Sequence, residues 1–119
     1  FKLIKRALPG PYTFVLKSSK SLPHYFKKKK TVGIRVPDHP IAVSIVDLLG
    51  NPIISTSIHD EDDVIEYTTD PELIYEKWSG LVDIVIDAGF GGNEPSTVID
   101  LSKNDIQIIR KGKGNIDIL

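Results

Sequence analysis

An alternation of β-rich and helix-forming segments, each cut short by proline or glycine, is the feature that most constrains how this chain folds. Residues 12–17 and 31–36 are rich in β-branched and aromatic side chains and end at turn-forming residues, which is typical of strands. Residues 40–49 carry apolar side chains at helical spacing, with a proline near their start and Gly50 after their end. The alternation predicts an α/β fold.

Four further segments complete the predicted sheet. Residues 52–57 are nearly all apolar at their start, as expected of a buried strand, and residues 82–89 have a similar character. Residues 96–101 and 105–112 alternate in a way that suits an antiparallel hairpin. We therefore predict a mixed sheet of parallel and antiparallel strands with flanking helices.

The remaining helices are predicted from their start and stop residues. Residues 1–8 are typical of the end of an amphipathic helix, which Pro9-Gly10-Pro11 stops. Residues 21–28 suit a short helix with a proline in its first turn. An N-cap aspartate, a proline and a first-turn acid open a helix over 70–78, and the acid-rich residues 60–66 before it predict a loop.

Length and composition limit the class of protein. The 119 residues fit one domain, and the absence of cysteine excludes a disulfide scaffold, a thiolate metal site and a cysteine nucleophile. This fits a reducing cytosol, so a cytoplasmic location is expected. No apolar run reaches the ~18–20 residues of a membrane span. Because the chain lacks methionine and opens inside a helical pattern, residues 1–119 are expected to be the C-terminal portion of a longer single domain, with the N-terminal part missing.

The charge is distributed very unevenly along the chain. Residues 1–30 carry nine Lys or Arg and no acid, whereas residues 31–109 carry fifteen acids and three basic residues. The basic third could attract the phosphate of a nucleotide or of RNA. The run from Lys27 to Lys30 by itself fits a solvated surface better, and it contains no aromatic residue that would stack on a base.

Candidate ligand-binding residues stand at the predicted strand ends. Ser55-Thr56-Ser57 closes the third predicted strand, where the hydroxyls would either bind a ligand at the carboxyl edge of the sheet or cap the strand locally. Arg35 lies in an otherwise apolar strand, so either a partner carboxylate or an anionic ligand is expected beside it. Arg110 stands beside Lys111 at the end of the last predicted strand, where exposed cations are common.

The spacing of residues in this sequence does not match several well-known site motifs. The turn Gly89-Phe90-Gly91-Gly92, which precedes Pro95-Ser96, matches neither the dinucleotide fingerprint nor the Walker phosphate loop. The three histidines lack zinc-ligand spacing, so no metal ligand is assigned. Ser57, His59 and Asp60 are too close along one segment for a catalytic triad. No catalytic residue is assigned from the sequence.

Taken together, several segments resemble the YrdC/YciO family in the same order and spacing across essentially the whole chain. The segments are LPGPYTFVL (8–16), GIRVPDHPIA (33–42), PIISTSIH (52–59), VDIVIDAG with PSTVIDL (82–89 and 95–101) and IIRKGKG (108–114). The resemblance implies a twisted α/β sheet around a positively charged cavity. The best understood members are L-threonylcarbamoyl-AMP synthases, which join L-threonine, bicarbonate and ATP in the modification of tRNA, and double-stranded RNA binding is a further family attribute.

The resemblance also implies site residues. The synthases use a Lys-x-Arg pair, which would precede Phe1, and a Ser-x-Asn pair, which aligns with Ser57 and His59. Histidine in place of asparagine, followed by two acids, is similar to the YciO branch. Ser57 and His59 are implied to contact ATP, with or without magnesium, while Ser96 lines the cavity.

The same resemblance implies that Arg35 and Arg110 balance phosphate charge. The expected function is nucleotide and RNA handling related to threonylcarbamoyl-AMP synthesis, with tRNA or double-stranded RNA as a partner and no membrane. The alternative is a non-enzymatic double-stranded RNA-binding module that grips phosphates with the basic third. Oligomeric state is not predicted.

Overall fold

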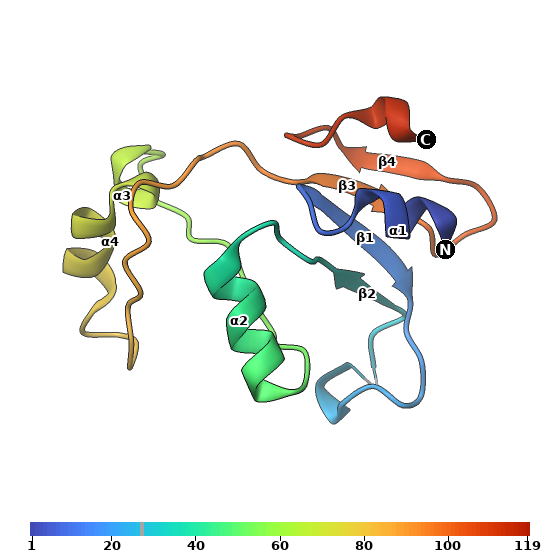
Figure 1. Cartoon of the computed structure of the whole chain (residues 1–119), viewed down its shortest axis with the longest axis horizontal. Helices are drawn as coiled ribbons and strands as arrows, with labels where there is room; N and C mark the ends of the chain where they lie inside the picture. Colours follow the sequence, from blue (N-terminus) through green and yellow to red (C-terminus); the bar gives the residue numbers. More distant parts are fainter. Residues whose placement is uncertain (27) are drawn as a thin grey trace. The chain divides into compact units, whose positions relative to one another are not determined.

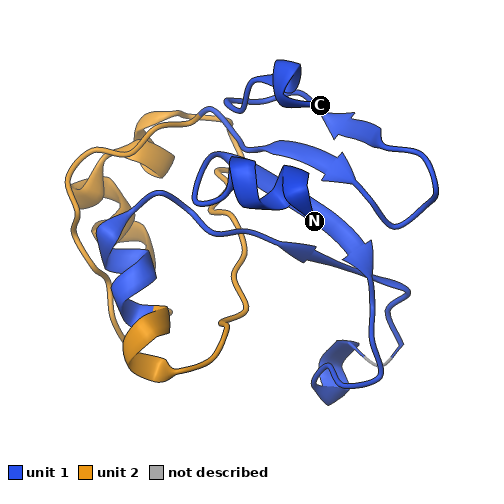
Figure 2. Ribbon diagram, turned by 45° about the vertical axis from the view of Figure 1, so that its right-hand side comes forward, with its two compact units in different colours: residues 1–45, 94–119 blue, residues 46–93 orange. Residues whose placement is uncertain are grey.

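The computed structural model describes residues 1–26 and 28–119, so Lys27 of the lysine run lies outside the described residues. The chain divides into two compact units (Figure 2). The first comprises residues 1–45 and 94–119, and the second comprises residues 46–93.

The first unit is built on a sheet of four strands (Figure 1): β1 (Tyr12–Lys17), β2 (Thr31–Ile34), β3 (Thr97–Asp100) and β4 (Gln107–Arg110). The spatial order is β2-β1-β3-β4. β1 is antiparallel to β2 and parallel to β3, and β3 forms the predicted antiparallel hairpin with β4. The predicted mixed sheet is therefore confirmed.

The core of this unit lies where the two central strands meet. Phe14 of β1 and Ile99 of β3 are paired in register, and both side chains are fully buried. Ala7 is buried against them at the end of α1 (Lys2–Ala7), the helix predicted over residues 1–8. Burial of these apolar side chains is the main force that holds the central strands and the helix together.

Tyr12 fastens the C-terminal segment to the start of β1. Its hydroxyl donates a hydrogen bond to the carbonyl oxygen of Asn115 at 2.9 Å. Its ring lies against Gly114, where an added Cβ would overlap the ring atoms. Only glycine allows so close an approach. η2 (Ile116–Ile118) follows this contact, and Ile118 accepts a hydrogen bond from Arg6 of α1.

The helices largely follow their predicted boundaries. α2 (Pro40–Leu49) ends at Gly50, whose φ of 77° lies in the left-handed region that glycine adopts without strain. α4 (Pro71–Trp78) begins at Asp70, whose side chain accepts a hydrogen bond from the Glu72 N–H at 2.9 Å. Two differences arise: the helix predicted over 21–28 is reduced to η1 (His24–Phe26), and the loop predicted through residue 66 gives way to α3 (Glu66–Thr69).

Two predicted strands are absent from the described residues, since neither residues 52–57 nor residues 82–89 form a ladder in the structure. Their apolar side chains are exposed, including Ile54 and Ile84, which are 67% and 76% exposed. A strand needs a neighbour that accepts and donates its backbone hydrogen bonds, and apolar character alone cannot supply one. These two predictions are wrong for this structure.

None of the helices formed by the described residues has the length and apolar character that crossing a membrane requires.

Candidate functional site

One edge of the sheet gathers four segments that are far apart in the sequence. Because β1 and β3 are parallel and each is antiparallel to its outer neighbour, β1 and β3 begin where β2 and β4 end. We call this the motif edge, and it consists of residues 9–13, 35–37, 94–97 and 110–114.

Backbone hydrogen bonds join the four segments of the motif edge. The Gly10 N–H donates to the carbonyl of Val36 at 2.9 Å, and the Thr97 N–H donates to that of Pro11 at 3.0 Å. The Lys113 N–H donates to the carbonyl of Pro95 at 2.9 Å. The loops that begin and end the strands are therefore held by the sheet.

Ser96 is the centre of a polar cluster at this edge. Ser96 is only 6% exposed, and its Oγ lies 2.8 Å from Oγ1 of Thr13. The Arg110 guanidinium donates to the Ser96 carbonyl from Nε at 3.1 Å and from Nη2 at 2.9 Å, and Nη2 also lies 3.3 Å from Ser96 Oγ. The structure thus brings together two of the residues predicted from the sequence.

Thr97 shapes the loop that follows β4. Its Oγ1 donates to the carbonyl of Gly114 at 2.6 Å and accepts from the Gly112 N–H at 3.0 Å. An added Cβ at Gly112 would overlap the backbone of Pro95 and Ser96, so the loop requires glycine there. Thr97 is not among the site residues predicted from the sequence. Its position beside Ser96 in the PSTV motif was the available indication.

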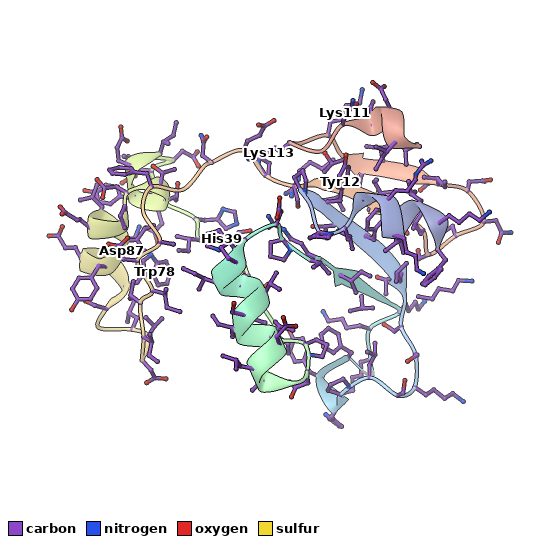
Figure 3. All side chains as sticks on the ribbon, viewed as in Figure 1. Tyr12, His39, Trp78, Asp87, Lys111 and Lys113 are labelled. Atoms are coloured by element: carbon purple, nitrogen blue, oxygen red, sulfur yellow. The ribbon has the colours of Figure 1, made fainter. Side chains whose placement is uncertain are left out.

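Cations without carboxylate partners surround this polar cluster. Arg35, Lys111 and Lys113 are exposed, and among the described residues none has a carboxylate oxygen within 4 Å. Figure 3 shows Tyr12 at the start of β1 and the two lysines on the segment after β4. Clustered cations of this kind create a positive potential that attracts anions.

Arg35 differs from its prediction in one respect. It was predicted to lie within an apolar strand, but β2 ends at Ile34 and Arg35 is exposed. An exposed guanidinium is solvated by water and needs no ion-pair partner, so the burial argument for a ligand does not apply to it. Arg35 remains a candidate because the strand pairing places it on the motif edge.

Ser57 and His59 belong to the second unit and lie in an exposed segment outside any strand or helix. The predicted position of Ser57 at a strand end is therefore wrong. Among the residues described, no hydrogen bond joins either side chain to another group. No group of three or more His, Asp or Glu within the described part of the chain is arranged to hold a metal ion.

Asp60, the residue after His59, is engaged in its own contacts. Its Oδ1 accepts a hydrogen bond from Nζ of Lys77 at 2.6 Å, and its Oδ2 accepts from the N–H groups of Asp62 and Val64. These donors, Lys77 above all, hold the pKa of Asp60 below its ordinary value of 3.8. Because Lys77 lies 17 residues away, nothing in the local sequence indicated the pair.

The Asp60 contacts predict a specific response to acid. A carboxyl whose folded-state pKa is lowered stabilises the fold above its unfolded pKa of about 3.8, and this contribution is lost as pH falls through the lower folded-state value. Urea unfolding of Asp60→Asn from pH 7 to pH 2 should therefore show a weaker loss of stability below about pH 4 than wild type. Asp62→Asn, at a neighbouring exposed position, is the control. Parallel acid profiles for Asp60→Asn and wild type would contradict the assignment.

Comparisons with known proteins agree with the arrangement of the motifs. The Sua5/YciO/YrdC family model, described as "Telomere recombination", matches residues 1–112. The uncharacterised protein YciO of Escherichia coli is 40% identical over 119 residues, which are 98% of this chain and 57% of that protein. A putative threonylcarbamoyl-AMP synthase of Methanocaldococcus jannaschii is 36% identical over 93% of this chain and 51% of its own length.

Solved structures give the same result. The crystal structure of E. coli YciO superposes with a TM-score of 0.87 at 40% identity, covering 99% of this chain and 58% of that one. P. abyssi Sua5 complexed with L-threonine superposes with a TM-score of 0.75 at 32% identity, covering 93% of this chain and 33% of that one. The chain thus spans a little over half the length of its YciO relatives. The family model, the sequence identity and the shared fold agree that this chain belongs to the Sua5/YciO/YrdC family.

Proposed function

We propose that this chain is part of a nucleotide- and RNA-handling protein whose chemistry is related to threonylcarbamoyl-AMP synthesis, and that its motif edge holds the phosphates of ATP. The observation that carries the proposal is the meeting of Arg35, Arg110, Lys111 and Lys113 on one edge of the sheet without carboxylate partners among the described residues. Relatives named threonylcarbamoyl-AMP synthase, at 30–36% identity, support the reaction class.

The proposed chemistry depends mainly on charge and position. Adenylate formation joins an oxygen nucleophile to the α-phosphorus of ATP, breaks the bond to the β-phosphate and releases pyrophosphate. Negative charge accumulates on the phosphate oxygens during this step, and guanidinium and ammonium groups stabilise it. Arg110 is already oriented by Ser96, so little side-chain freedom would be lost when it meets a phosphate.

L-threonine, bicarbonate and ATP, with or without magnesium, are the substrates and cofactors that the proposal assigns. The structure of Sua5 complexed with L-threonine supports the amino-acid substrate. Ser57 is proposed to contact ATP, and His59 stands where the synthase pattern has asparagine.

RNA is the proposed macromolecular partner, and a non-enzymatic RNA-binding module is the second candidate function. Its support is the exposed position of every described lysine in residues 1–30, a stretch that contains no acid. Binding through phosphates would weaken steeply with salt and would need no nucleotide. A tRNA partner and a cytoplasmic location are part of the same proposal.

The experiment that separates the candidates is product formation from threonine, bicarbonate and ATP by the full-length protein. We expect slow formation of threonylcarbamoyl-AMP by wild type and faster formation by His59→Asn, because the amide restores a donor and an acceptor at every pH. His24→Asn, an exposed histidine outside the proposed site, is the matched control.

Two results would contradict these expectations. Wild-type turnover equal to that of a synthase relative would support the proposed reaction and would show that histidine replaces asparagine without loss. Salt-sensitive binding to duplex RNA, with no product from either form and no binding of ATP, would favour the non-enzymatic module.

A further inference from the structure

A shallow hollow lies at the end of β1 that is opposite the motif edge. It is lined by Ser18, Ser19, Lys20, Phe26 and Lys29 and has a volume of about 370 Å³. The two ends of the segment that forms it are joined by a hydrogen bond from the Ser18 N–H to the Lys30 carbonyl at 3.0 Å. We call it the Ser18 hollow, and all of its lining residues belong to the first unit.

The backbone around the Ser18 hollow is ordered by local turns. The Leu22 N–H donates to the Ser19 carbonyl at 3.3 Å, and the Lys29 N–H donates to the Phe26 carbonyl at 2.9 Å. The Phe26 ring meets that of Tyr25 edge to face, with 5.1 Å between the ring centroids. The backbone around the hollow is therefore held by hydrogen bonds, and the ring of Phe26 is held by its contact with Tyr25.

The chemistry of the lining suits an anion. Lys20 and Lys29 are both exposed, and among the described residues neither has a carboxylate oxygen within 4 Å. The hydroxyl of Ser18 is buried and has no hydrogen-bond partner within the described part of the chain. A buried hydroxyl without a partner costs free energy. A turn of the Ser18 side chain toward the hollow would let this hydroxyl donate to a ligand oxygen. The Ser19 hydroxyl, 2.6 Å from that of Ser21, can donate to a ligand while it accepts from Ser21.

The ring of Phe26 adds an apolar surface beside these donors. A ligand that carries a phosphate and a flat base would use both kinds of surface, because bases stack on aromatic rings while ammonium groups bind phosphate oxygens. No aromatic residue interrupts the lysine run in the sequence, and the fold places Phe26 in the hollow with Lys29.

We propose that the Ser18 hollow binds the phosphate group of a nucleotide, with the base against Phe26, as a site separate from the motif edge. The six residues of β1 separate the two places by roughly 20 Å, which is too far for one mononucleotide to reach both. The inference goes beyond the proposed function because it does not depend on ATP binding at the motif edge. Both a free nucleotide and a nucleotide unit of single-stranded RNA have the required chemistry.

The test is a titration of the ¹⁵N-labelled full-length protein, followed through the amide resonances of Ser18, Ser19 and Lys20. AMP, adenosine, inorganic phosphate and a tetra-adenylate without terminal phosphates are added separately. Saturable shifts are expected with AMP and the tetra-adenylate, and weaker shifts with the other two. If AMP binds more tightly than the tetra-adenylate, the ligand is a free nucleotide. If the tetra-adenylate binds more tightly, the ligand is a nucleotide unit of single-stranded RNA. The resonances of Lys111 to Gly114 report the motif edge independently, so failure at one place is distinguishable from failure at the other.

Matched variants decide whether the hollow itself binds. The double variant Lys20→Gln/Lys29→Gln should weaken AMP binding about tenfold, whereas Lys2→Gln/Lys5→Gln removes the same charge from α1 and should leave it unchanged. Phe26→Leu should weaken AMP binding without affecting the weaker binding of inorganic phosphate. Three results would each overturn the proposal. They are equal losses of AMP affinity in the two double variants, equal affinity for inorganic phosphate and AMP, and the absence of a saturable shift at Ser18 to Lys20.

Discussion

Replacing Phe14 by alanine is expected to lower the free energy of unfolding by about 3–5 kcal/mol. Its side chain is fully buried at the centre of β1, in register with Ile99 and stacked on Tyr12 with 6.2 Å between the ring centroids. Removing the ring leaves a cavity on the face of the two central strands, beside Ala7 and Ile99, which the packed neighbours can only partly fill. Urea unfolding followed by circular dichroism measures the change.

Phe90→Ala is the matched control, because the same ring is removed from a side chain that is 77% exposed. Its effect on the free energy of unfolding should stay within about 0.5 kcal/mol. Similar losses for Phe14→Ala and Phe90→Ala would show that the core of the first unit is not where the structure places it.

Replacing Arg110 should weaken nucleotide binding by the full-length protein at least tenfold, about the value of one charge-assisted hydrogen bond. Nε and Nη2 of its guanidinium are held by the Ser96 carbonyl. Nη1 has no hydrogen-bond partner among the described residues and is available to a phosphate. Arg110→Gln removes the charge, while Arg110→Lys keeps it but lacks the planar fork that binds Ser96 and a ligand together. Both variants are therefore expected to bind ATP poorly in calorimetric titrations.

The control for Arg110 is Lys103→Gln, which removes one positive charge from the turn between β3 and β4, at the other end of the strands. It should leave ATP affinity unchanged. If Arg110→Lys binds ATP as wild type does, charge alone is sufficient and the oriented guanidinium is not required. If Lys103→Gln weakens binding as much as Arg110→Gln, the motif edge is not the site.

Local sequence was sufficient where the determinants of an element lie within a few residues. Asp70, Pro71 and Glu72 supply the side-chain cap, the preset φ and the favourable charge of a helix start, and α4 begins where they predict. Gly50 ends α2 in the left-handed region for the same kind of reason. The family motifs were equally local, and their order along the chain identified the family.

Pairing between distant segments was decided only by the tertiary structure. Residues 52–57 have the composition of a buried strand, yet their side chains are exposed, because hydrophobicity indicates a preference for burial and does not supply the neighbouring strand. Arg35 was predicted inside a strand that ends one residue earlier. The contact of Asp60 with Lys77 spans 17 residues and has no local indication.

The candidate site was likewise predicted in part from the local sequence and decided in part by the tertiary structure. The sequence by itself singled out the residues that we propose to carry the chemistry, since Ser96, Arg110 and Arg35 stand out by type and position within their motifs. Only the fold decided that they share one edge, because that depends on β1 being parallel to β3 while the outer strands are antiparallel. Strand direction and register are set by packing between segments that lie up to about a hundred residues apart, and local propensity carries no information about them.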